Sequence, residues 1–488
     1  MDLVRKNRII PVLYILASLV IFAYIAAKAT VSSFTHDESF SYLRYVSHGF
    51  MDLVSNKDAY TNNHILNTLC MKYSEMVFGN SALALRLPNL LLLVVFFVYA
   101  YLLLRKVNPV VGFCIFILMA TNTALIDFFG LARGYGLSIG FMTLSLYSLI
   151  KSLEEKRTWN LILFNIGALM AIFSNFTLLT FYVAALAVFN FIILAEGRTT
   201  IREKIRLYQL NKVNIIFLFI FLLVLYEPVR KAVKFNSFDF GGKHGFMHDT
   251  GMSVIYHLFN NMPLNPAGIL LIQMVLSAIM LVPFVLILAN LVLVKRDFFL
   301  RNRSMVAVNL VFLLIAVETV VQHYLLKTDY LVGRFSLFLV PLLLLNFGFL
   351  MDYLMKFRFR PLIYSFVITL SLLSAGNFYR NTNLYACAEW YYDRETKNAV
   401  LALIRDHQAA AGSQRNVKLG INWLFEPTIN FYRETWNLSW LLPVDRNGLT
   451  AQDQYEYIFT ADSAGVTNRS CDIIFSSGIT GTRLTRVK

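Results

Sequence analysis

The chain has 488 residues, of which 57% are hydrophobic and only 15% are charged, and its mean hydropathy is +0.58. This composition excludes an ordinary water-soluble protein. The net charge of +15 would suit a nucleic-acid partner, but most Lys and Arg residues stand in short clusters between apolar runs. That pattern indicates membrane topology, so we expect a membrane environment and no nucleic acid.

Apolar runs of about 20 residues match the ~30 Å hydrocarbon thickness of a bilayer and predict membrane-spanning helices. No cleavage site follows the first run, so it is interpreted as a retained span. We predict an all-α polytopic membrane domain over residues 1–380 and a small α/β domain over residues 381–488. About eleven spans are expected by the length criterion, beginning near residues 9, 82, 109, 134, 159, 177, 213, 267, 304, 333 and 361.

Charge clusters between the spans predict the orientation of the chain. The N-terminal cluster and the loops on its side hold about 20 Lys and Arg, against about 11 in the opposite loops before the tail. The positive-inside rule therefore places the N-terminus in the cytoplasm and the C-terminus outside. The N-terminal cluster is Arg5, Lys6 and Arg8, and the outer segments are residues 30–81, 230–266 and the tail from about 378.

The first outer segment begins with THDESF, in which His36 precedes the adjacent acids Asp37 and Glu38. A carboxylate at the membrane surface can take a proton from an acceptor hydroxyl. Equally, Thr35 or Asp37 could cap a helix whose first turn favours acids. The apolar spacing predicts amphipathic helices in the membrane interface within about residues 36–78.

The same segment continues with YTNNHILNT, which contains Asn62, Asn63 and His64. Asn and His can hydrogen-bond sugar hydroxyls, whereas an Asn at this point could simply cap the next helix. His64 could also bind a metal together with Asp37 and Glu38. No ligand spacing demands a metal, so no cofactor is predicted with certainty and a divalent ion stays open.

Basic residues stand at the outer ends of two later spans. ARGYGLS carries Arg133 and Tyr135, and KTDYLVGRFSLFLVP carries Lys327 and Arg334. An arginine near the hydrocarbon is costly unless it meets a carboxylate or phosphate, although it could also snorkel to lipid head groups. Glu318 within the ninth span is either functional or hydrogen-bonded to a neighbouring helix.

The second outer segment contains HGFMH, which spaces His244 and His248 four residues apart. A helix could bring these histidines together over a metal. The glycines around them favour a flexible loop, and we interpret the segment as a mobile substrate lid. In the tail, Cys387 and Cys471 could pair, although free thiols are the favoured interpretation.

The motifs THDESF, ALRLPNLL, ARGYGLS and GRFSLFLVPLLLL, in this order, resemble those of membrane glycosyltransferases with the C-type (GT-C) fold. The resemblance is to the bacterial protein O-mannosyltransferase and aminoarabinose lipid A transferase group, and it covers most of residues 1–380. It implies a sugar donor carried on a polyprenyl monophosphate in a bacterial cytoplasmic membrane. It also implies that Asp37 is the base, that Glu38 orients the acceptor or an arginine, that Arg133 pairs with the acid site, and that Arg334 contacts the phosphate.

The expected function is therefore inverting transfer of a sugar to an acceptor hydroxyl on the outer face of the membrane. A glycosidase needs two carboxylates because its leaving alcohol must be protonated, whereas a phosphate leaves as an anion and one base suffices. The acceptor is a glycan, a lipid or a protein. The donor-binding group is Arg133, Arg334, Lys327 and Tyr135, and the sugar- or acceptor-binding group is His36, Asn63 and His64.

Two alternatives from other classes remain open at this stage. A transporter or flippase would place polar groups near mid-bilayer, and Glu318 and Lys28 are the residues that favour it. A glycan polymerase or ligase that uses diphosphate-linked lipids would have similar outer arginines.

Overall fold

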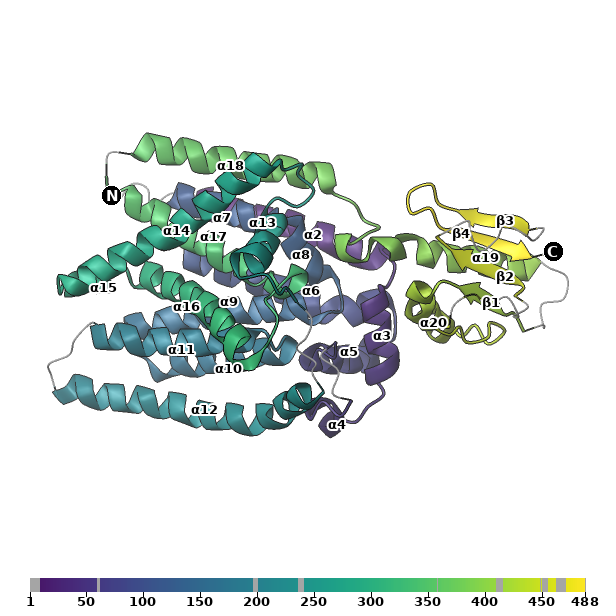
Figure 1. Cartoon of the computed structure of the whole chain (residues 1–488), viewed down its shortest axis with the longest axis horizontal. Helices are drawn as coiled ribbons and strands as arrows, with labels where there is room; N and C mark the ends of the chain where they lie inside the picture. The colour runs from purple at the N-terminus through teal and green to yellow at the C-terminus, as the bar shows by residue number, and fades with distance from the viewer. Residues whose placement is uncertain are drawn as a thin grey trace.

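A computed structural model describes residues 9–58, 62–195, 201–235, 241–357, 359–409, 416–447, 449, 455–461 and 471–487, without the side chains of 201–210, 232 and 296. The basic cluster Arg5, Lys6 and Arg8 lies outside the described residues. The described chain forms a bundle of long helices with a small mixed unit at one end (Figure 1).

The helices of the bundle follow the predicted apolar runs. In chain order they are α2 (Ile9–Val31), α3 (His36–Tyr45), α4 (Phe50–Val54), α5 (Ile65–Phe78), α6 (Ala82–Leu104), α7 (Pro109–Ala120), α8 (Thr123–Ile126), η1 (Asp127–Gly130), α9 (Gly134–Glu155), α10 (Thr158–Ser174), α11 (Leu178–Ala195), α12 (Ile201–Lys234), η2 (Met247–Gly251), α13 (Met252–Leu258), α14 (Pro266–Val292), α15 (Arg296–Arg301), α16 (Arg303–Leu326), η3 (Gly333–Ser336), α17 (Leu339–Leu354) and α18 (Arg360–Asn381).

Nine of the described helices are long and apolar enough to cross a membrane, and a bent pair makes a tenth. The 17-residue helix α10 is apolar but shorter than the others. Together these account for the eleven predicted runs, and the prediction of an all-α polytopic membrane protein is confirmed. Central helices α9 and α17 are about four-fifths buried, whereas the outer helices α2, α14 and α18 are mostly exposed. Their apolar outer faces are the surfaces that lipid would cover.

The third predicted span is broken rather than continuous. α7 ends at Ala120, and the segment Thr123–Gly130 continues at an angle of 61°. The side chain of Asn122 accepts the backbone N–H of Leu125 and so caps a new helix start. The side chain of Thr121 turns back to the carbonyl of Ile117, which helps to end the preceding helix.

The first outer segment contains the predicted short helices α3, α4 and α5. The first half of α5 is largely buried, while its second half exposes apolar side chains at Tyr73, Met76, Val77 and Phe78. Such a stripe is suited to lipid contact. The interfacial position of these helices stays a prediction.

The C-terminal unit is a four-stranded mixed sheet with helices packed on it. Strand order is β1-β2-β4-β3, with β1 parallel to β2 and the other pairs antiparallel. The elements are η4 (Ala388–Glu395), α19 (Thr396–Ala409), β1 (Leu419–Ile421), η5 (Trp423–Phe425), α20 (Glu426–Thr435), β2 (Tyr457–Thr460), β3 (Cys471–Ser476) and β4 (Arg483–Val487). This confirms the predicted small α/β unit, and Cys387 and Cys471 are free thiols.

The apolar run SWLLPV, residues 439–444, predicts a strand, but no strand is formed there. The segment makes only an isolated parallel bridge between Leu441 and Val417. Pro443 has no N–H group with which to continue the ladder. The expectation of a strand here was wrong.

The C-terminal unit shares a hydrophobic core with the first outer segment. The ring of Phe34 stacks on that of Phe431 at 4.1 Å, and the N–H of Phe34 donates to the hydroxyl of Tyr432 at 2.8 Å. Helix α20 packs against α3. These contacts fix the position of the N-terminal end of α3, where both acids of THDESF lie.

Candidate active site

Helix α3 begins with Thr35 as its N-cap, so one of the two cap interpretations is confirmed. The carboxylate of Glu38 accepts the backbone N–H of Thr35 at 2.9 Å, which is one half of a capping box. Asp37 and Glu38 both lie in the first turn, where the helix dipole favours acids. The two carboxylates nevertheless have different surroundings.

Glu38 forms a saturated ion pair with Arg86. The guanidinium donates two hydrogen bonds to the carboxylate, at 2.8 and 2.6 Å, and both side chains are fully buried. The remaining N–H groups of Arg86 donate to oxygens of Ala29, Ser32 and Ser33. Because every group has partners, this pair fixes the start of α3 against α6.

Glu38 also accepts the N–H of Ala132 at 2.6 Å. Ala132 directly precedes Arg133, so the carboxylate helps to hold the backbone from which Arg133 extends. The arginine in direct contact with Glu38 is Arg86, which stands in the ALRLPNLL motif but was not singled out as a site residue.

Asp37 lies between two other guanidinium groups. Its Oδ2 atom is 3.1 Å from Arg334 and 3.4 Å from Arg133. Burial disfavours the charged carboxylate, but the two guanidinium groups outweigh burial and hold the pKa of Asp37 below its ordinary value. The sequence therefore pointed to three residues, Asp37, Arg133 and Arg334, that the fold brings together.

Arg133 is locked in place. It is fully buried and donates to the hydroxyl of Ser41 at 2.8 Å and to the carbonyl of Asp37 at 3.3 Å. It also donates to both the carbonyl and the side-chain oxygen of Asn62. Moving this guanidinium would break several hydrogen bonds at once.

Arg334 is held less firmly. Its side chain is 22% exposed and extends from the short helix η3, where its second carboxylate partner is Glu389 at 3.3 Å. The guanidinium lies over the rings of Trp390 and Tyr135, at 5.1 and 5.9 Å from their centroids. The C-terminal unit thus contributes Glu389 and Trp390 to the surroundings of the base.

The second outer segment positions η3. The N–H of Gly333 donates to Ser253 at 3.0 Å, and its carbonyl accepts from His257 at 2.8 Å. Farther out, Gly242 and Tyr330 exchange two backbone hydrogen bonds. A Cβ atom on Gly242 would lie 2.2 Å from the carboxyl carbon of Asp249, so this glycine permits close packing. In the described part of this segment, Gly242 serves packing, and the lid role stays a prediction.

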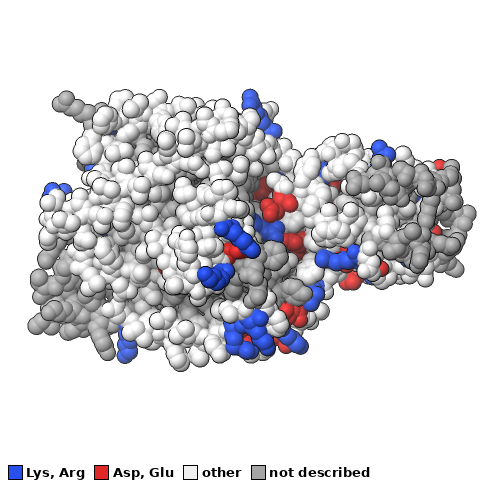
Figure 2. Space-filling view, viewed as in Figure 1, with Lys and Arg blue, Asp and Glu red and all other residues white. Residues whose placement is uncertain are grey.

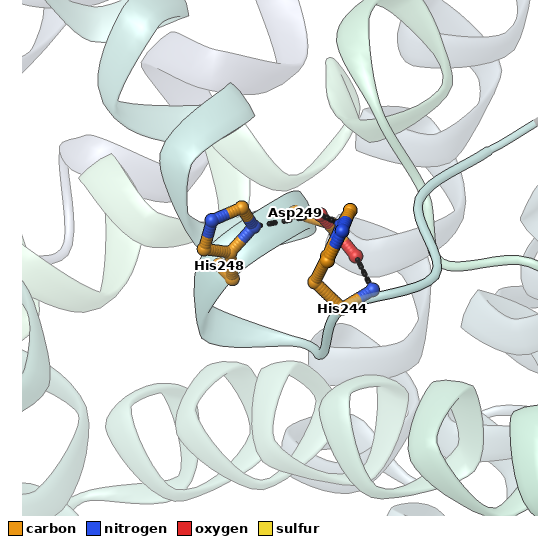
Figure 3. A group of neighbouring side chains, drawn as sticks. All are labelled: His244, His248 and Asp249. Carbon is orange, nitrogen blue, oxygen red and sulfur yellow. Dashed lines mark hydrogen bonds and ion pairs between the residues drawn. The ribbon is translucent and has the colours of Figure 1, made fainter.

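Figure 3 shows His244 and His248 on either side of Asp249, whose carboxylate bonds to His248 and to the backbone N–H of His244. Their ligand atoms lie within 4.8 Å of one another, so these side chains could hold a divalent cation. Among the described residues, no comparable grouping joins Asp37, Glu38 and His64. The oxygens of Glu38 are already taken by Arg86.

His36 attaches α3 to the C-terminal unit. Its Nδ1 lies 2.7 Å from the carbonyl of Leu424 and must donate, which leaves Nε2 to accept from Arg446 at 3.2 Å. Burial lowers the pKa of His36, in keeping with this neutral form. Asn63 bonds to Asn56 and Thr68 inside the first outer segment. Both side chains therefore have structural partners.

His64 differs from the other predicted sugar-binding residues because one of its ring nitrogens has no described partner. Its Nδ1 donates to the carbonyl of Ser174 at 2.7 Å, and its ring meets that of Tyr135 at 4.8 Å. The buried Nε2 has no hydrogen-bond partner among the described residues. Burial and the charge of Arg133 lower the pKa of His64 well below its ordinary value, so Nε2 presents a lone pair.

Three other predicted residues lie apart from Asp37. Lys327 is exposed at the end of α16, in a left-handed conformation with φ of 58°, and no described contact joins it to Asp37. Lys28 forms a buried ion pair with Asp127 at 2.8 Å. Glu318 has one buried oxygen without a partner among the described residues.

Figure 2 shows acidic and basic side chains gathered where the bundle meets the C-terminal unit, while most of the visible bundle surface is uncharged.

Two solved structures share this architecture over nearly the whole chain. The crystal structure of ArnT from Cupriavidus metallidurans in the apo state has a TM-score of 0.52 and 11% identity, covering 98% of this chain and 97% of that chain. The structure of the same protein bound to undecaprenyl phosphate has a TM-score of 0.51 and 12% identity, with the same coverage. The chain has the GT-C fold of ArnT. No family model and no curated protein matches the sequence.

Within this GT-C fold, the residues missed from the sequence are Arg86, Asn62 as a partner of Arg133, and Glu389 with Trp390. Arg86 carried a usable signal, because a charge inside the opening turns of an apolar span needs a buried partner. Asn62 stood in the NNH motif beside the residues that were chosen. Glu389 and Trp390 gave no signal, since only the folded C-terminal unit brings them to Arg334.

Proposed function

We propose that the protein is an integral membrane glycosyltransferase that moves a sugar from a polyprenyl-phosphate donor to an acceptor hydroxyl, with inversion and with Asp37 as the base. The observation that carries this proposal is one carboxylate held between a locked arginine and a more exposed one. The structure of ArnT with undecaprenyl phosphate supports the donor class by its fold. The reaction takes place on the outer face of a bacterial cytoplasmic membrane, with the N-terminus inside.

Binding of the donor phosphate separates Asp37 from Arg334. In the resting arrangement Arg334 neutralises Asp37, and an ion-paired carboxylate is a weak proton acceptor. A phosphate that binds Arg334 competes with Asp37 for the guanidinium, because arginine binds phosphate and carboxylate through the same fork. The pKa of Asp37 then rises, so the carboxylate becomes a stronger base only when the donor is present.

Transfer then requires one proton movement. Asp37 takes the proton of the acceptor hydroxyl as its oxygen attacks the anomeric carbon. The bond from that carbon to the phosphate oxygen breaks on the opposite face, and its electron pair leaves with the phosphate. Arg334 stabilises the departing anion, so no general acid is needed. Attack opposite the leaving group inverts the anomeric centre.

The other predicted residues take supporting roles. Glu38 is a positioning residue that acts through Arg86 and Ala132. Tyr135 lies under Arg334 and orients it, and the Nε2 atom of His64 accepts from a sugar hydroxyl. Lys327 reaches the donor only from the edge of the site. His36 and Asn63 act by holding the outer segment in place.

An apolar groove of about 790 Å³ between α11 and α12 offers a place for the isoprenoid chain. Its lining includes Leu186, Phe221 and Leu225, with Arg230 at one end. Nearby Lys231 donates to the carbonyl of Ser55 in the first outer segment, which links this end of α12 to the loop that carries Asn62.

The test replaces Asp37 with Asn. The purified variant and wild type are incubated with a set of hexosyl and pentosyl undecaprenyl monophosphates and with a cell-envelope extract as the source of acceptor, and released undecaprenyl phosphate is measured by mass spectrometry. Loss of a general base lowers the rate by about 10²- to 10⁴-fold. Binding of undecaprenyl phosphate itself is expected to persist, because Asp37 competes with phosphate for Arg334. Full transfer activity in the variant would overturn the assignment.

Two further arms of the assay, with diphosphate-linked donors and with protein in lipid vesicles, separate the alternatives. A polymerase or ligase would consume diphosphate-linked donors instead of monophosphates. A flippase would move lipid between leaflets of a vesicle without releasing sugar. Of the two residues that favoured a flippase, Lys28 is paired with Asp127, and Glu318 alone remains without a described partner.

A further inference from the structure

A polar cavity lies at the end of the bundle opposite the C-terminal unit. Its volume is about 410 Å³, and it is formed where α6, α9 and α17 end and where α15 passes into α16 (Figure 1). Nothing in the proposed transfer reaction uses this cavity. Two acidic residues line it, Glu154 and Asp352. The basic residues of its lining are Arg105, Lys106, Lys151, Arg301 and Arg303.

The carboxylates of this cavity are already occupied. Glu154 accepts from Lys106 at 2.6 Å and lies 3.8 Å from Lys151. Asp352 accepts the backbone N–H of Asn108 at 2.7 Å. Lys151 also pairs with Glu155 at 2.8 Å, and Arg301 lies 3.9 Å from Asp297, but neither of these acids lines the cavity. Five basic and two acidic residues line it, so the lining has a net positive charge. An anion would find several cations within one small volume.

A further feature favours an anion at this position. α16 begins at the cavity wall, and its N-cap Asn302 makes no side-chain cap bond. The Asn302 side chain instead donates to Phe298 and accepts from Lys356. The first turn of α16 thus has no side-chain cap, and the N–H groups at the start of a helix attract anions.

We propose that this cavity binds the phosphate of an anionic phospholipid headgroup in the leaflet on its own side of the membrane. The lipid source is favoured because exposed apolar side chains surround the same end of the bundle, at Leu293, Val294, Leu300, Phe357 and Phe359. Acyl chains would lie against such residues while the phosphate enters the cavity. The charge pattern of the sequence predicts that this is the cytoplasmic side, where anionic lipids attract basic residues.

The test measures lipid binding to the full-length protein in detergent by native mass spectrometry. The probes are phosphatidylglycerol, phosphatidylcholine and inorganic phosphate. The double variant Arg105→Gln, Arg303→Gln removes two of the five cations of the cavity. We expect phosphatidylglycerol affinity to fall by about tenfold or more, because each basic residue near an anionic lipid contributes several-fold to binding.

The matched control is Arg157→Gln, which removes an exposed arginine that does not line the cavity but follows α9 at the same end of the bundle. It should bind phosphatidylglycerol as wild type does. The charge-keeping variant Arg105→Lys, Arg303→Lys should retain most binding, and thermal unfolding checks that each variant is folded. Equal binding of the two lipids, or unchanged binding by the Gln double variant, would overturn the proposal. Binding of inorganic phosphate but not of phosphatidylglycerol would show that the cavity does not take its phosphate from a lipid.

Discussion

Glu38 and Asp37 are neighbours in one helical turn, yet the regions around them are built in opposite ways. Glu38 is fully buried with Arg86, and all strong donors of that arginine are used. Asp37 meets Arg334, whose side chain is partly exposed and shared with Glu389. The first pair has no freedom to bind a substrate, whereas the second can exchange a carboxylate for a phosphate. Chemistry is expected where an ion pair is incompletely satisfied.

The largest effect on stability is expected from Glu38→Gln. This change leaves Arg86 charged in a buried site without its counterion, which costs about 3–5 kcal/mol. Thermal unfolding of the detergent-purified protein should show a clear loss of stability. The matched change Asp37→Asn should cost less, because Arg334 keeps Glu389 and partial access to water, and buried Arg133 keeps its hydrogen bonds to Ser41 and Asn62. Equal destabilisation by the two variants would contradict the distinction between the pairs.

Asp393 provides a third carboxylate at the same helix end, and its described hydrogen-bond partners are neutral. It accepts the N–H of His36 at 2.6 Å and the hydroxyl of Thr396 at 3.1 Å. Burial raises the pKa of Asp393 to about 8, although these hydrogen bonds oppose the rise. The carboxyl group therefore stays protonated in the folded protein at a pH where the unfolded chain has lost that proton.

This difference predicts a pH effect on stability. Between about pH 4 and pH 8 the folded state binds the extra proton, so stability falls as pH rises, by at most about 1.4 kcal/mol per pH unit, and levels off above that window. Asp393→Asn removes this titration. The stability of wild type relative to the variant, measured by thermal unfolding, should therefore decrease from pH 5 to pH 7. Exposed Asp297→Asn is the control and should run parallel to wild type.

Apolar length is a local signal, so the sequence predicted the span positions. The grouping of Asp37, Arg133 and Arg334 was implied by the resemblance to GT-C glycosyltransferases, because isolated surface charges do not show which of them meet. The residues by themselves did not distinguish Asp37 from Glu38, to which only the resemblance gave different roles, since their difference depends on Arg86 and Arg334 from distant segments. Likewise, Asn63 was chosen over Asn62, although only the folded loop aims Asn62 at Arg133. The break after Ala120 and the missing strand at Leu441 also depended on particular polar residues and a proline, which hydrophobic patterns do not weigh.

Arg334→Gln tests the exchangeable pair directly. Its removal should weaken donor binding about tenfold, because a charge-assisted contact to the phosphate is lost. It should also raise the pKa of Asp37, since one of the two guanidinium groups that lower this pKa is gone. The base must be ionised, so the acidic limb of the profile of kcat/KM against pH should move to higher pH. The effects of Arg334→Lys on donor binding and on the acidic limb should be smaller than those of Arg334→Gln, because lysine keeps the positive charge but lacks the paired donors of the guanidinium. An unmoved acidic limb would show that Arg334 does not control Asp37.

Lys327→Gln should give the smallest effect and sharpens the same comparison. Lys327 stands near Arg334 in the sequence, but it is exposed and has no described contact with Asp37. If it only attracts the donor from the edge of the site, KM should rise about two- to threefold, as for a screened surface charge, and high salt should remove the difference. The acidic limb should stay where it is in wild type, because no charge that acts on Asp37 has changed. A shift of that limb as large as the one in Arg334→Gln would mean that Lys327 approaches the base when the donor binds, and the exchange would then involve two cations.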